Sequence, residues 1–286
     1  MKGLLCGLIG SGIQRSLSPA LQEGEARHHG LRLHYQLIDL DAARAGVEAL
    51  PGLIDAARIM DFAGLNITYP CKQLVIPLLD ALSEEARAIG AVNTVVRQGG
   101  RLVGYNTDAS GWSWGFRRAL PGADLSRVVL LGAGGAGAAC ADAVLRLGAE
   151  RLVVVDQEPA RAAALVERLN EHFPKGRASS AADPAAALQG ATGLIQATPV
   201  GMAKHPGTPL AEALLRPDMW VSEIVYVPLE TPLLKAAQRI GCPTADGGHM
   251  NVGQAIGGFK LFTGLDADPA RMEAHFRELA ARPGVA

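Results

Sequence analysis

The sequence lacks a strong charge of either sign and lacks clustered cysteine or histidine. Its 27 basic and 28 acidic residues give a formal net charge of −1, so charge provides no basis for binding nucleic acid or an anionic membrane. The seven histidines are scattered, and the adjacent pair His28-His29 does not have the spacing of metal ligands. The four cysteines lie far apart without a C-x-x-C pair, at Cys6, Cys71, Cys140 and Cys242. These absences argue against a zinc module or a disulfide scaffold, and they predict a protein without a metal site in a reducing compartment.

The sequence also lacks a clear secretory leader or membrane span. The apolar stretch at the N-terminus ends by Gly10, and polar Gln14-Arg15-Ser16 follows with no small-residue cleavage site. The apolar region 128–149 contains a glycine cluster together with Asp142 and Arg146, which argue against a spanning helix. We therefore predict that the N-terminus forms a buried strand and that the protein is cytoplasmic.

What the sequence does contain is a composition typical of a globular protein with substantial cores. It has 286 residues, of which 49% are hydrophobic and 19% charged, enough for two domains of ordinary size. Apolar strand-like segments alternate with helical ones without an internal repeat, which predicts an α/β fold with mostly parallel sheets covered by helices. The expected strands are 4–9, 33–40, 64–68, 92–96, 102–105, 128–131, 152–155, 194–197 and 220–225. Helices are expected from an N-cap at Ser18 to Gly30, and at 42–59, 74–82, 84–89, 110–120, 138–147, 159–172, 184–188, 231–240, 250–262 and 269–280.

The most informative stretch is the glycine turn, Gly132-Ala133-Gly134-Gly135-Ala136-Gly137. It follows one expected strand and opens a helix, and a second strand then ends in Asp156. This strand–turn–helix–strand pattern is typical of a Rossmann unit that binds a dinucleotide. Gly132 permits the tight turn, Gly134 lets the backbone approach the pyrophosphate, and Gly137 lets helix and strand pack closely. The alternative is a glycine-rich turn in some other α/β protein.

Asp156 indicates which dinucleotide is bound. A carboxylate at the tip of the second strand accepts hydrogen bonds from both ribose hydroxyls of NAD and repels the 2′-phosphate of NADP. Gln157 and Glu158 add no cation there, although Arg161 lies five residues beyond Asp156. The tip therefore favours NAD over NADP.

Lys72 is the first candidate for proton transfer, which an alcohol oxidation by NAD requires. The chain has only six lysines against 21 arginines. Because an arginine does not release its proton whereas a partly buried lysine can be tuned to do so, a lysine after the strand end Asn66-Ile67-Thr68 is informative. A solvated lysine at a helix start is an equally good interpretation of these residues alone.

Other polar residues follow expected strand ends or precede helices. Asp108 ends Asn106-Thr107-Asp108 and is a second catalytic candidate, or an N-cap for the connecting helix. Asn93 and Asn106 can bind hydroxyl groups or stabilise turns. Ser16 and Ser18 can bind a carboxylate near a helix N-terminus, although ordinary capping explains Ser18 equally well.

Taken together, these stretches resemble the shikimate/quinate dehydrogenase family along nearly the whole chain. Eight matches occur in order, and together they are far more specific than any one of them. They are 16–19 (SLSP), 64–72 (GLNITYPCK), 90–94 (GAVNT), 104–108 (GYNTD), the glycine turn, 197–202 (ATPVGM), 225–234 (VYVPLETPLL) and 254–255 (QA).

The resemblance implies roles for individual residues. Lys72 and Asp108 would form the catalytic pair, and Ser16 and Ser18 would hold a substrate carboxylate. Ring hydroxyls would be bound by Thr68, Asn93 and Gln254, with Tyr226 near substrate and nicotinamide, and Thr198 and Val225 would join the glycine turn and Asp156 in binding the cofactor. It also implies a substrate-binding domain of residues 1–108 and 247–286 and a Rossmann domain of residues 109–246, in which 109–120 is a connecting helix, with the two facing each other across a cleft.

The chain departs from the family pattern at three positions. The chain has Glu223 at a position where the family commonly has Asp, and His249 where the family commonly has Gly. It has Gly253 at the position before Gln254, where His is frequent in the family. Asp156-Gln157-Glu158 is similar to the NAD-using quinate/shikimate branch, whereas many NADP-using members carry Asn-Arg-Ser/Thr there. In the NAD-using branch, threonine often replaces the second serine of Ser-x-Ser-Pro, and this threonine suits quinate. The serine at Ser18 therefore favours shikimate.

The sequence thus predicts an NAD-dependent oxidoreductase that interconverts shikimate and 3-dehydroshikimate, in the shikimate pathway of aromatic amino acid biosynthesis. The expected partner is a small cyclohexene or cyclohexane carboxylic acid, with no nucleic acid or membrane, and a homodimer is the candidate oligomer. Quinate or an amino-shikimate is the alternative substrate, and a non-catalytic NAD sensor is the alternative from another class. A methylene-tetrahydrofolate-type dehydrogenase ranks lower because it would not need Ser16 and Ser18.

Overall fold

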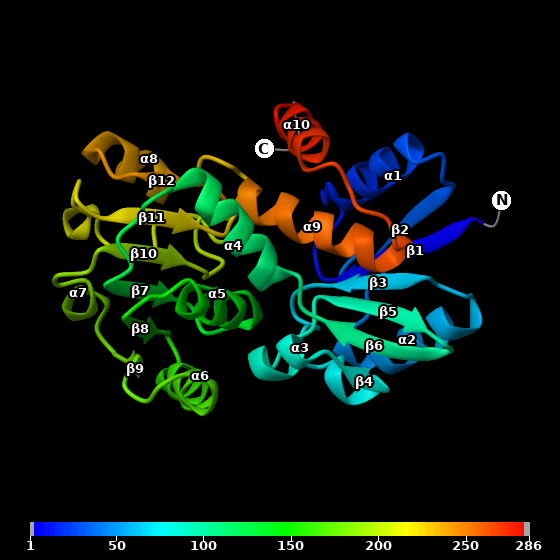
Figure 1. The fold of residues 1–286 in the computed structure, drawn as a ribbon, viewed down its shortest axis with the longest axis horizontal. Coiled ribbons are helices and arrows are strands. Elements are labelled where there is room, and N and C mark those ends of the chain that lie inside the picture. Colours follow the sequence, from blue (N-terminus) through cyan, green and yellow to red (C-terminus); the bar gives the residue numbers. More distant parts are fainter. Residues whose placement is uncertain (1–2, 283–286) are drawn as a thin grey trace. The chain divides into compact units, whose positions relative to one another are not determined.

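The protein, described here by a computed structural model of residues 3–282, divides into two compact units. The first unit contains the residues through Thr107 and returns with Gln254–Ala281, and the second contains Asp108–Gly253 (Figure 1). Residues 1, 2 and 283–286, which the sequence analysis assigned to the substrate domain, lie outside the described residues.

The first unit is built on a six-stranded mixed sheet with the order β2-β1-β3-β5-β6-β4. The first three strands are parallel, because α1 (Ser18–His28) and α2 (Leu50–Ile59) provide the crossovers, whereas β5 runs antiparallel to both β3 and β6. The β5–β6 hairpin turns at Gly99 and Gly100, both with positive φ (56° and 82°). The strands are β1 Leu4–Gly10, β2 Leu33–Asp39, β3 Gly64–Ile67, β4 Ala81–Leu82, β5 Thr94–Gln98 and β6 Arg101–Tyr105.

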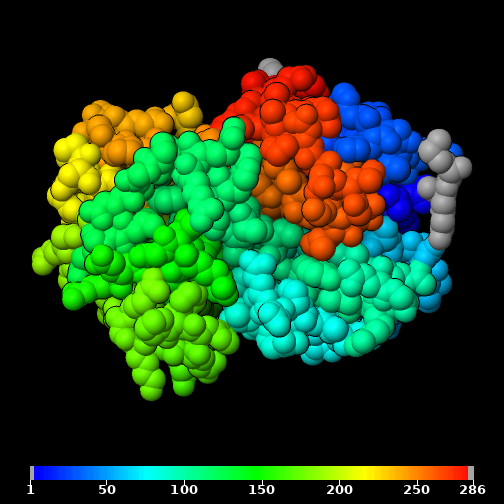
Figure 2. Space-filling model, viewed as in Figure 1, coloured from blue at the N-terminus to red at the C-terminus, as the bar shows by residue number. Residues whose placement is uncertain are grey.

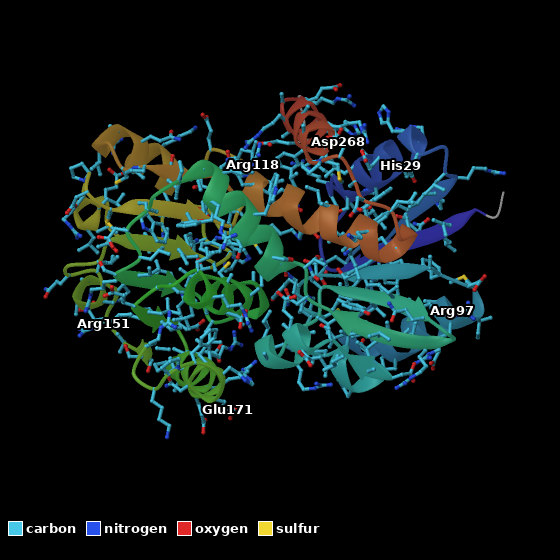
Figure 3. All side chains as sticks on the ribbon, viewed as in Figure 1. His29, Arg97, Arg118, Arg151, Glu171 and Asp268 are labelled. Carbon is cyan, nitrogen blue, oxygen red and sulfur yellow. The ribbon has the colours of Figure 1, made fainter. Side chains whose placement is uncertain are left out.

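Two helices far apart in the sequence are joined in the first unit by a buried carboxylate. Glu25 of α1 is 2% exposed and accepts two hydrogen bonds from the Arg271 guanidinium of α10 (2.6 and 2.7 Å) and one from the Asp268 amide. Burial raises the pKa of Glu25, but these bonds and one from His29 prevail and lower it to about 2. Figures 2 and 3 show α10 beside α1, and Figure 3 labels Asp268 and His29. The helices of this unit are α1 Ser18–His28, α2 Leu50–Ile59, α3 Glu84–Ile89, the part of α9 (Gly247–Thr263) from Gln254 onward, and α10 Pro269–Ala280.

The second unit is a six-stranded sheet that is parallel throughout, with the order β12-β11-β10-β7-β8-β9. The chain builds outward from β7 to β9, then returns to the other side of β7 and builds outward from β10 to β12. The order therefore reverses between β7 and β10, at the type of switch point where α/β sheets bind ligands beyond the carboxyl ends of their strands. The strands are β7 Arg127–Leu131, β8 Arg151–Val155, β9 Ala178–Ser180, β10 Gly193–Gln196, β11 Trp220–Glu223 and β12 Thr244–Ala245.

Helices and apolar side chains cover the second sheet. Every side chain of β7 after Arg127 is buried, as are all residues of α5 from Gly137 to Leu145. Except for Asp142 in α5, all of these buried residues are nonpolar or cysteine. The exception within α5 is Asp142, which is 2% exposed and bound at both oxygens by Arg146 one turn later. The helices are α4 Asp108–Ala119, α5 Gly135–Arg146, α6 Pro159–His172, α7 Pro184–Ala187 and α8 Pro232–Ile240, together with the start of α9.

Several local predictions were wrong. Ser18 does not cap α1: Leu17 holds the N-cap position without a side-chain bond, and Ser18 is the first helical residue. Residues 74–82 form a short 3₁₀ turn (Ile76–Leu78) and strand β4 instead of a helix, since Pro77 lacks an amide proton and Ala81–Leu82 pair with β6. In 42–59 only α2 is an α-helix, preceded by a 3₁₀ turn at Val47–Ala49, and the proline lies in its first turn rather than interrupting it.

Within residues 3–282, no helix combines the length and the apolar character that crossing a membrane requires. In the same range no group of three or more His, Cys, Asp or Glu side chains is arranged to hold a metal ion. The four cysteines are buried, and none of them forms a disulfide within residues 3–282.

Candidate active site

The glycine turn in the second unit is shaped by contacts that only glycine permits. Gly132 has φ of 97°, and its amide donates to the carbonyl of Val155 at the end of β8 (2.8 Å). A β-carbon at Gly132 would lie 2.8 Å from the carbonyl oxygen of Ala197. The helix α5 then begins with Gly134 at its N-cap, where no side chain caps the helix and no atom lies within 4 Å of where a β-carbon would be. Uncapped amides beside open space at a helix N-terminus fit the pyrophosphate of a dinucleotide.

Asp156 lies beside this turn at the tip of β8. One of its oxygens accepts a hydrogen bond from the Ala133 amide (2.7 Å), and the other accepts from the Glu158 amide (2.9 Å). The nearby Arg161 side chain forms an ion pair with Glu158 (3.0 Å). The end of β8 therefore presents the Asp156 carboxylate, and the Arg161 guanidinium that follows it in sequence is already paired with Glu158. This fits two ribose hydroxyls better than a 2′-phosphate.

Two buried polar side chains lie side by side at the ends of β10 and β11. Gln196 and Glu223 are register partners, 0% and 1% exposed. The Gln196 Nε2 donates to the Thr198 hydroxyl (2.8 Å) and to the Val200 carbonyl (2.9 Å). The Gln196 Oε1 accepts from the Thr198 backbone amide (3.1 Å). These bonds fix the loop that carries Thr198.

Glu223 fixes the loop that carries Val225 and Tyr226. Its Oε1 accepts from the amides of Ile224 and Val225 (2.9 and 3.0 Å), and its Oε2 accepts from the Thr231 hydroxyl (3.0 Å), which also caps α8. Burial raises the pKa of Glu223 to about 7, against the opposing effect of the three hydrogen bonds. The sequence analysis noted Glu223 only as a departure; a polar residue that ends an apolar strand was the available signal.

In the first unit, Lys72 lies in the turn that follows β3. The turn is closed by a bond from the Cys71 amide to the Thr68 carbonyl (2.8 Å), and the Val92 amide donates to the Lys72 carbonyl (2.8 Å). Lys72 is therefore fixed next to the segment that carries Asn93, and its side chain is partly buried. It lies in a turn and not at the helix start that the alternative interpretation expected.

A buried hydrogen-bond network holds Asn93 at the same sheet edge. The Asn93 Oδ1 accepts from the Thr107 amide (2.8 Å), and the Asn66 Nδ2 donates to the Asn93 carbonyl (3.2 Å) and to Thr94 Oγ1 (3.0 Å). The Tyr35 hydroxyl completes it by donating to Asn66 Oδ1 (2.6 Å). Of this network, the sequence analysis identified only Asn93 as a functional candidate.

The loop that carries Ser16 and Ser18 is held by Asp39 at the end of β2. The Asp39 carboxylate accepts from the amides of Gly12 and Ile13 (2.9 and 3.0 Å). Burial raises the pKa of Asp39, but hydrogen bonds from Gln14 and from the amides of Gly12, Ala42 and Asp41 prevail and lower it. Ser16 donates to the Ser18 hydroxyl (3.1 Å), so the two hydroxyls lie together. Asp39 was not a candidate from the sequence.

The structure thus gathers Ser16, Ser18, Thr68, Lys72 and Asn93 at the edge of the first sheet where β1, β2 and β3 end. The start of the returning segment packs on the same edge, because the Gln22 side chain donates to the Ala255 carbonyl (2.9 Å) and a β-carbon at Gly257 would touch Thr107. Gln254 directly precedes Ala255. In the second unit lie the glycine turn, Asp156, Thr198, Val225, Tyr226 and Asp108, the 4% exposed first residue of α4. The catalytic and binding roles of all these residues stay predictions.

Comparisons with known proteins identify the family. The family model described as "Shikimate dehydrogenase substrate binding domain" matches residues 8–95. The chain is 56% identical to a protein of Streptomyces avermitilis named shikimate dehydrogenase (NADP(+)), over 98% of this chain and 97% of that one. It is 45% identical to a protein of Corynebacterium efficiens named quinate/shikimate dehydrogenase (NAD(+)), over 96% and 98%. The chain belongs to the shikimate/quinate dehydrogenase family.

Solved structures agree with this assignment. The structure of quinate dehydrogenase from Corynebacterium glutamicum in complex with NAD superimposes with a TM-score of 0.89 at 43% identity, covering 96% of this chain and 99% of that one. The predicted family and α/β fold are confirmed, and the chain is an oxidoreductase. Which cofactor and which substrate this shikimate/quinate dehydrogenase prefers is a matter for proposal.

A matched pair of alanine variants tests the glycine turn. A β-carbon at Gly137 would overlap the carbonyl oxygen of Gly132, whereas one at Gly134 would meet no atom within 4 Å. Gly137→Ala should therefore lower the unfolding midpoint by several degrees, a change worth about 1 kcal/mol or more. Gly134→Ala should leave stability unchanged but weaken dinucleotide affinity about tenfold, since its methyl group enters the approach of the pyrophosphate. Thermal unfolding and cofactor titration of both variants give the answer, and equal effects on stability would contradict it.

A second prediction concerns Glu223 and pH. Its folded-state pKa of about 7 lies above the ordinary value of 4.5. The stabilising contribution is therefore complete below about pH 4.5 and is lost as the pH rises through 7. Between pH 5 and pH 8 the unfolding free energy of the wild type should fall by about 2 kcal/mol relative to Glu223→Gln, which does not titrate. Urea unfolding across this range measures the difference. The exposed Glu212→Gln is the control and should parallel the wild type, whereas a parallel Glu223→Gln curve would refute the assignment.

Proposed function

We propose that the protein is an NAD-dependent shikimate dehydrogenase, which reversibly oxidises the C3 hydroxyl of shikimate to give 3-dehydroshikimate. The observation that supports NAD is the Asp156 carboxylate, held beside the glycine turn by the Ala133 amide (2.7 Å). A 2′-phosphate beside it would meet like charge, and Arg161 is already paired with Glu158 (3.0 Å). The Streptomyces relative is named for NADP(+) and the Corynebacterium relative for NAD(+), so the proposal rests on this strand tip rather than on names.

In the proposed mechanism Lys72 is the acid/base group. NAD, when bound, supplies the acceptor for the hydride that leaves C3. As C3 loses its hydride, the hydroxyl proton passes to the neutral amine of Lys72, and in the reverse direction the ammonium returns it to the oxygen. Asp108 is the proposed partner that orients and tunes Lys72. The hydrogen bond from the Val92 amide to the Lys72 carbonyl (2.8 Å) fixes the turn that carries Lys72. This supports the acid/base role of Lys72, because such catalysis requires a group held in position.

The remaining residues of the first unit would bind the substrate. The adjacent hydroxyls of Ser16 and Ser18 (3.1 Å apart) are proposed to hold its carboxylate. Thr68, Asn93 and Gln254 are proposed to bind the ring hydroxyls. In the second unit, Tyr226 is proposed to lie near the substrate and nicotinamide, with Thr198 and Val225 lining the cofactor site.

Quinate is the second candidate substrate, because one of the similar solved structures is that of a quinate dehydrogenase. Quinate differs by its additional hydroxyl beside the carboxylate, so the residue that contacts this end should discriminate between the two acids. Ser18 instead of threonine favours shikimate, since threonine at this position suits quinate in the family pattern.

Initial rates of the purified protein with NAD and either acid test the substrate assignment. The proposal predicts that kcat/KM for shikimate exceeds that for quinate by at least about tenfold, a free-energy difference of one hydrogen bond. A preference for quinate would overturn the choice of substrate but not the reaction. If no cyclohexane or cyclohexene acid reduces NAD although NAD binds, the proposed reaction is wrong.

A further inference from the structure

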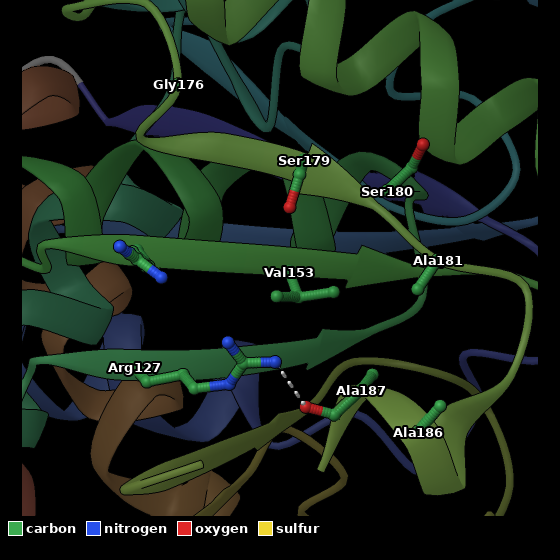
Figure 4. A pocket seen from close by; sticks show the side chains of 9 residues that line it. Arg127, Val153, Gly176, Ser179, Ser180, Ala181, Ala186 and Ala187 are labelled. Carbon is green, nitrogen blue, oxygen red and sulfur yellow. Dashed lines mark hydrogen bonds between the residues drawn. The ribbon is translucent and has the colours of Figure 1, made fainter. Parts of the chain in front are cut away.

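A cavity lies in the second unit, on the face of the sheet covered by α7. Its volume is about 440 Å³, and it opens between β7, β8, β9 and α7 (Figure 4). Two arginines and two serines line it, and the other lining residues are valine, glycine and alanine. None of the described lining residues is acidic. The cavity therefore presents hydrogen-bond donors and positive charge without a carboxylate to balance them.

Arg127 is the residue that most needs an additional partner. Its Nε is buried and has no hydrogen-bond partner among the described residues. The guanidinium makes one long bond, from Nη2 to the Ala187 carbonyl (3.4 Å), drawn as a dashed line in Figure 4. No described acid forms an ion pair with it. A guanidinium has five N–H donors, and a partly buried one with so few partners is costly unless a water or an ion supplies acceptors.

Arg151 adds a second positive charge at the neighbouring position of the adjacent strand. The two residues are register partners at the beginnings of β7 and β8, so they start the same row of the parallel sheet. Arg151, labelled in Figure 3, is exposed and forms no ion pair or side-chain hydrogen bond within residues 3–282. In Figure 4 the Ser179 hydroxyl points from β9 toward β8, which adds a third donor group to the cavity. Two adjacent like charges without a counter-charge favour a bound anion.

The geometry points to a binding site for a phosphate-type anion in this cavity, held by Arg127, Arg151 and Ser179. Guanidinium groups match the oxygens of a phosphoryl group with paired, charge-assisted bonds, and a hydroxyl supplies a further donor. The ligand class is therefore inorganic phosphate or the phosphoryl group of a phosphomonoester.

This cavity is separate from the proposed pyrophosphate site. The two arginines that line it lie at the beginnings of β7 and β8, whereas the glycine turn follows the end of β7 at Leu131. Five residues of extended strand separate the two ends by roughly 13 Å. An anion in this cavity is thus distinct from the cofactor, and its existence does not depend on the proposed function.

Calorimetric titration of the full chain with inorganic phosphate, in the presence of saturating NAD, tests the proposal. NAD blocks the glycine turn, so the expected result is one phosphate per chain that still binds. Arg127→Gln and Arg151→Gln should each raise the phosphate Kd at least about tenfold, the loss expected for one charge-assisted contact. Phosphate should also raise the unfolding temperature of the wild type, and this shift should disappear in both variants.

Matched variants separate the site from general charge effects. Arg239→Gln removes one positive charge from the same unit, but Arg239 is exposed and already paired with Glu212, so its phosphate affinity should equal that of the wild type. Ser179→Asp adds a negative charge to an exposed position of the cavity and should abolish binding. It decides the matter if Arg127→Gln does not fold.

Three results would overturn the proposal. They are no phosphate binding at all, binding that saturating NAD abolishes, and binding that is unchanged in Arg151→Gln and Ser179→Asp. The first would mean that only water fills the cavity, and the second that phosphate occupies the glycine turn.

Discussion

Replacing Lys72 with methionine should reduce the turnover number for shikimate by about 10²-fold or more while leaving KM within a few-fold of the wild-type value. The reason is that an acid/base group acts on the proton in the transition state, whereas other residues hold the substrate in the ground state. Steady-state rates at saturating NAD measure both constants. Lys72→Arg should be nearly as impaired, because arginine keeps the charge but does not release its proton.

The matched control for this prediction is Lys260→Met. Lys260 lies in the same unit, on the exposed side of α9, where it pairs with Asp266 (2.6 Å). Its replacement makes the same chemical change away from the proposed substrate site, so turnover should not change. If Lys72→Met retained near-normal turnover, Lys72 would have no part in the proton transfer. A large rise in KM with normal turnover would instead make it a substrate-binding residue.

Replacing Asp156 with asparagine should lower kcat/KM for NAD at least about tenfold. The ratio of kcat/KM for NAD to kcat/KM for NADP should fall by a larger factor, because the substitution also removes the repulsion of the 2′-phosphate. Asparagine is similar in size and keeps one oxygen acceptor, but it removes the charge that favours the ribose hydroxyls and repels a 2′-phosphate. Part of the loss will affect both cofactors, because Asp156 also holds the Ala133 amide of the glycine turn (2.7 Å). The ratio of the two kcat/KM values separates the two effects, since the loosened turn is common to both.

Glu171→Gln is the control for Asp156. It removes a negative charge from the same unit, on an exposed side chain of α6. Because exposed charges are screened, the cofactor ratio should change by less than about threefold. An equal response to Glu171→Gln and Asp156→Asn would mean that general charge, rather than the Asp156 carboxylate, selects the cofactor.

The parts of the fold that were predictable from the sequence are those whose local pattern and tertiary role agree. The apolar strands beside the glycine turn and the long helices α5, α6 and α10 were anticipated because periodicity and flanking residues agree with their burial. Strands β9 and β12 were missed because each has only two or three residues and depends on pairing with a neighbour. The same applies to β4, whose two residues pair with β6 although their surroundings favour a helix.

The candidate site shows the same division. Motif residues such as Lys72 and Asp156 could be named in advance, because strand ends and glycine turns have local signals. The side chains that hold Asn93 and the loop of Ser16 in place could not. Asn66 binds Thr94 across 28 positions, and Asp39 binds the amides of Gly12 and Ile13 across 27 and 26 positions. Such long-range hydrogen bonds depend on strand order, which single-sequence patterns do not specify.

The central claim is that the Asp156 carboxylate makes this member of the family prefer NAD to NADP. Its most direct test is the initial rate of the purified wild-type protein with shikimate and either NAD or NADP, each over a full concentration range. We predict that kcat/KM for NAD exceeds that for NADP at least about tenfold. A higher kcat/KM with NADP would contradict the account.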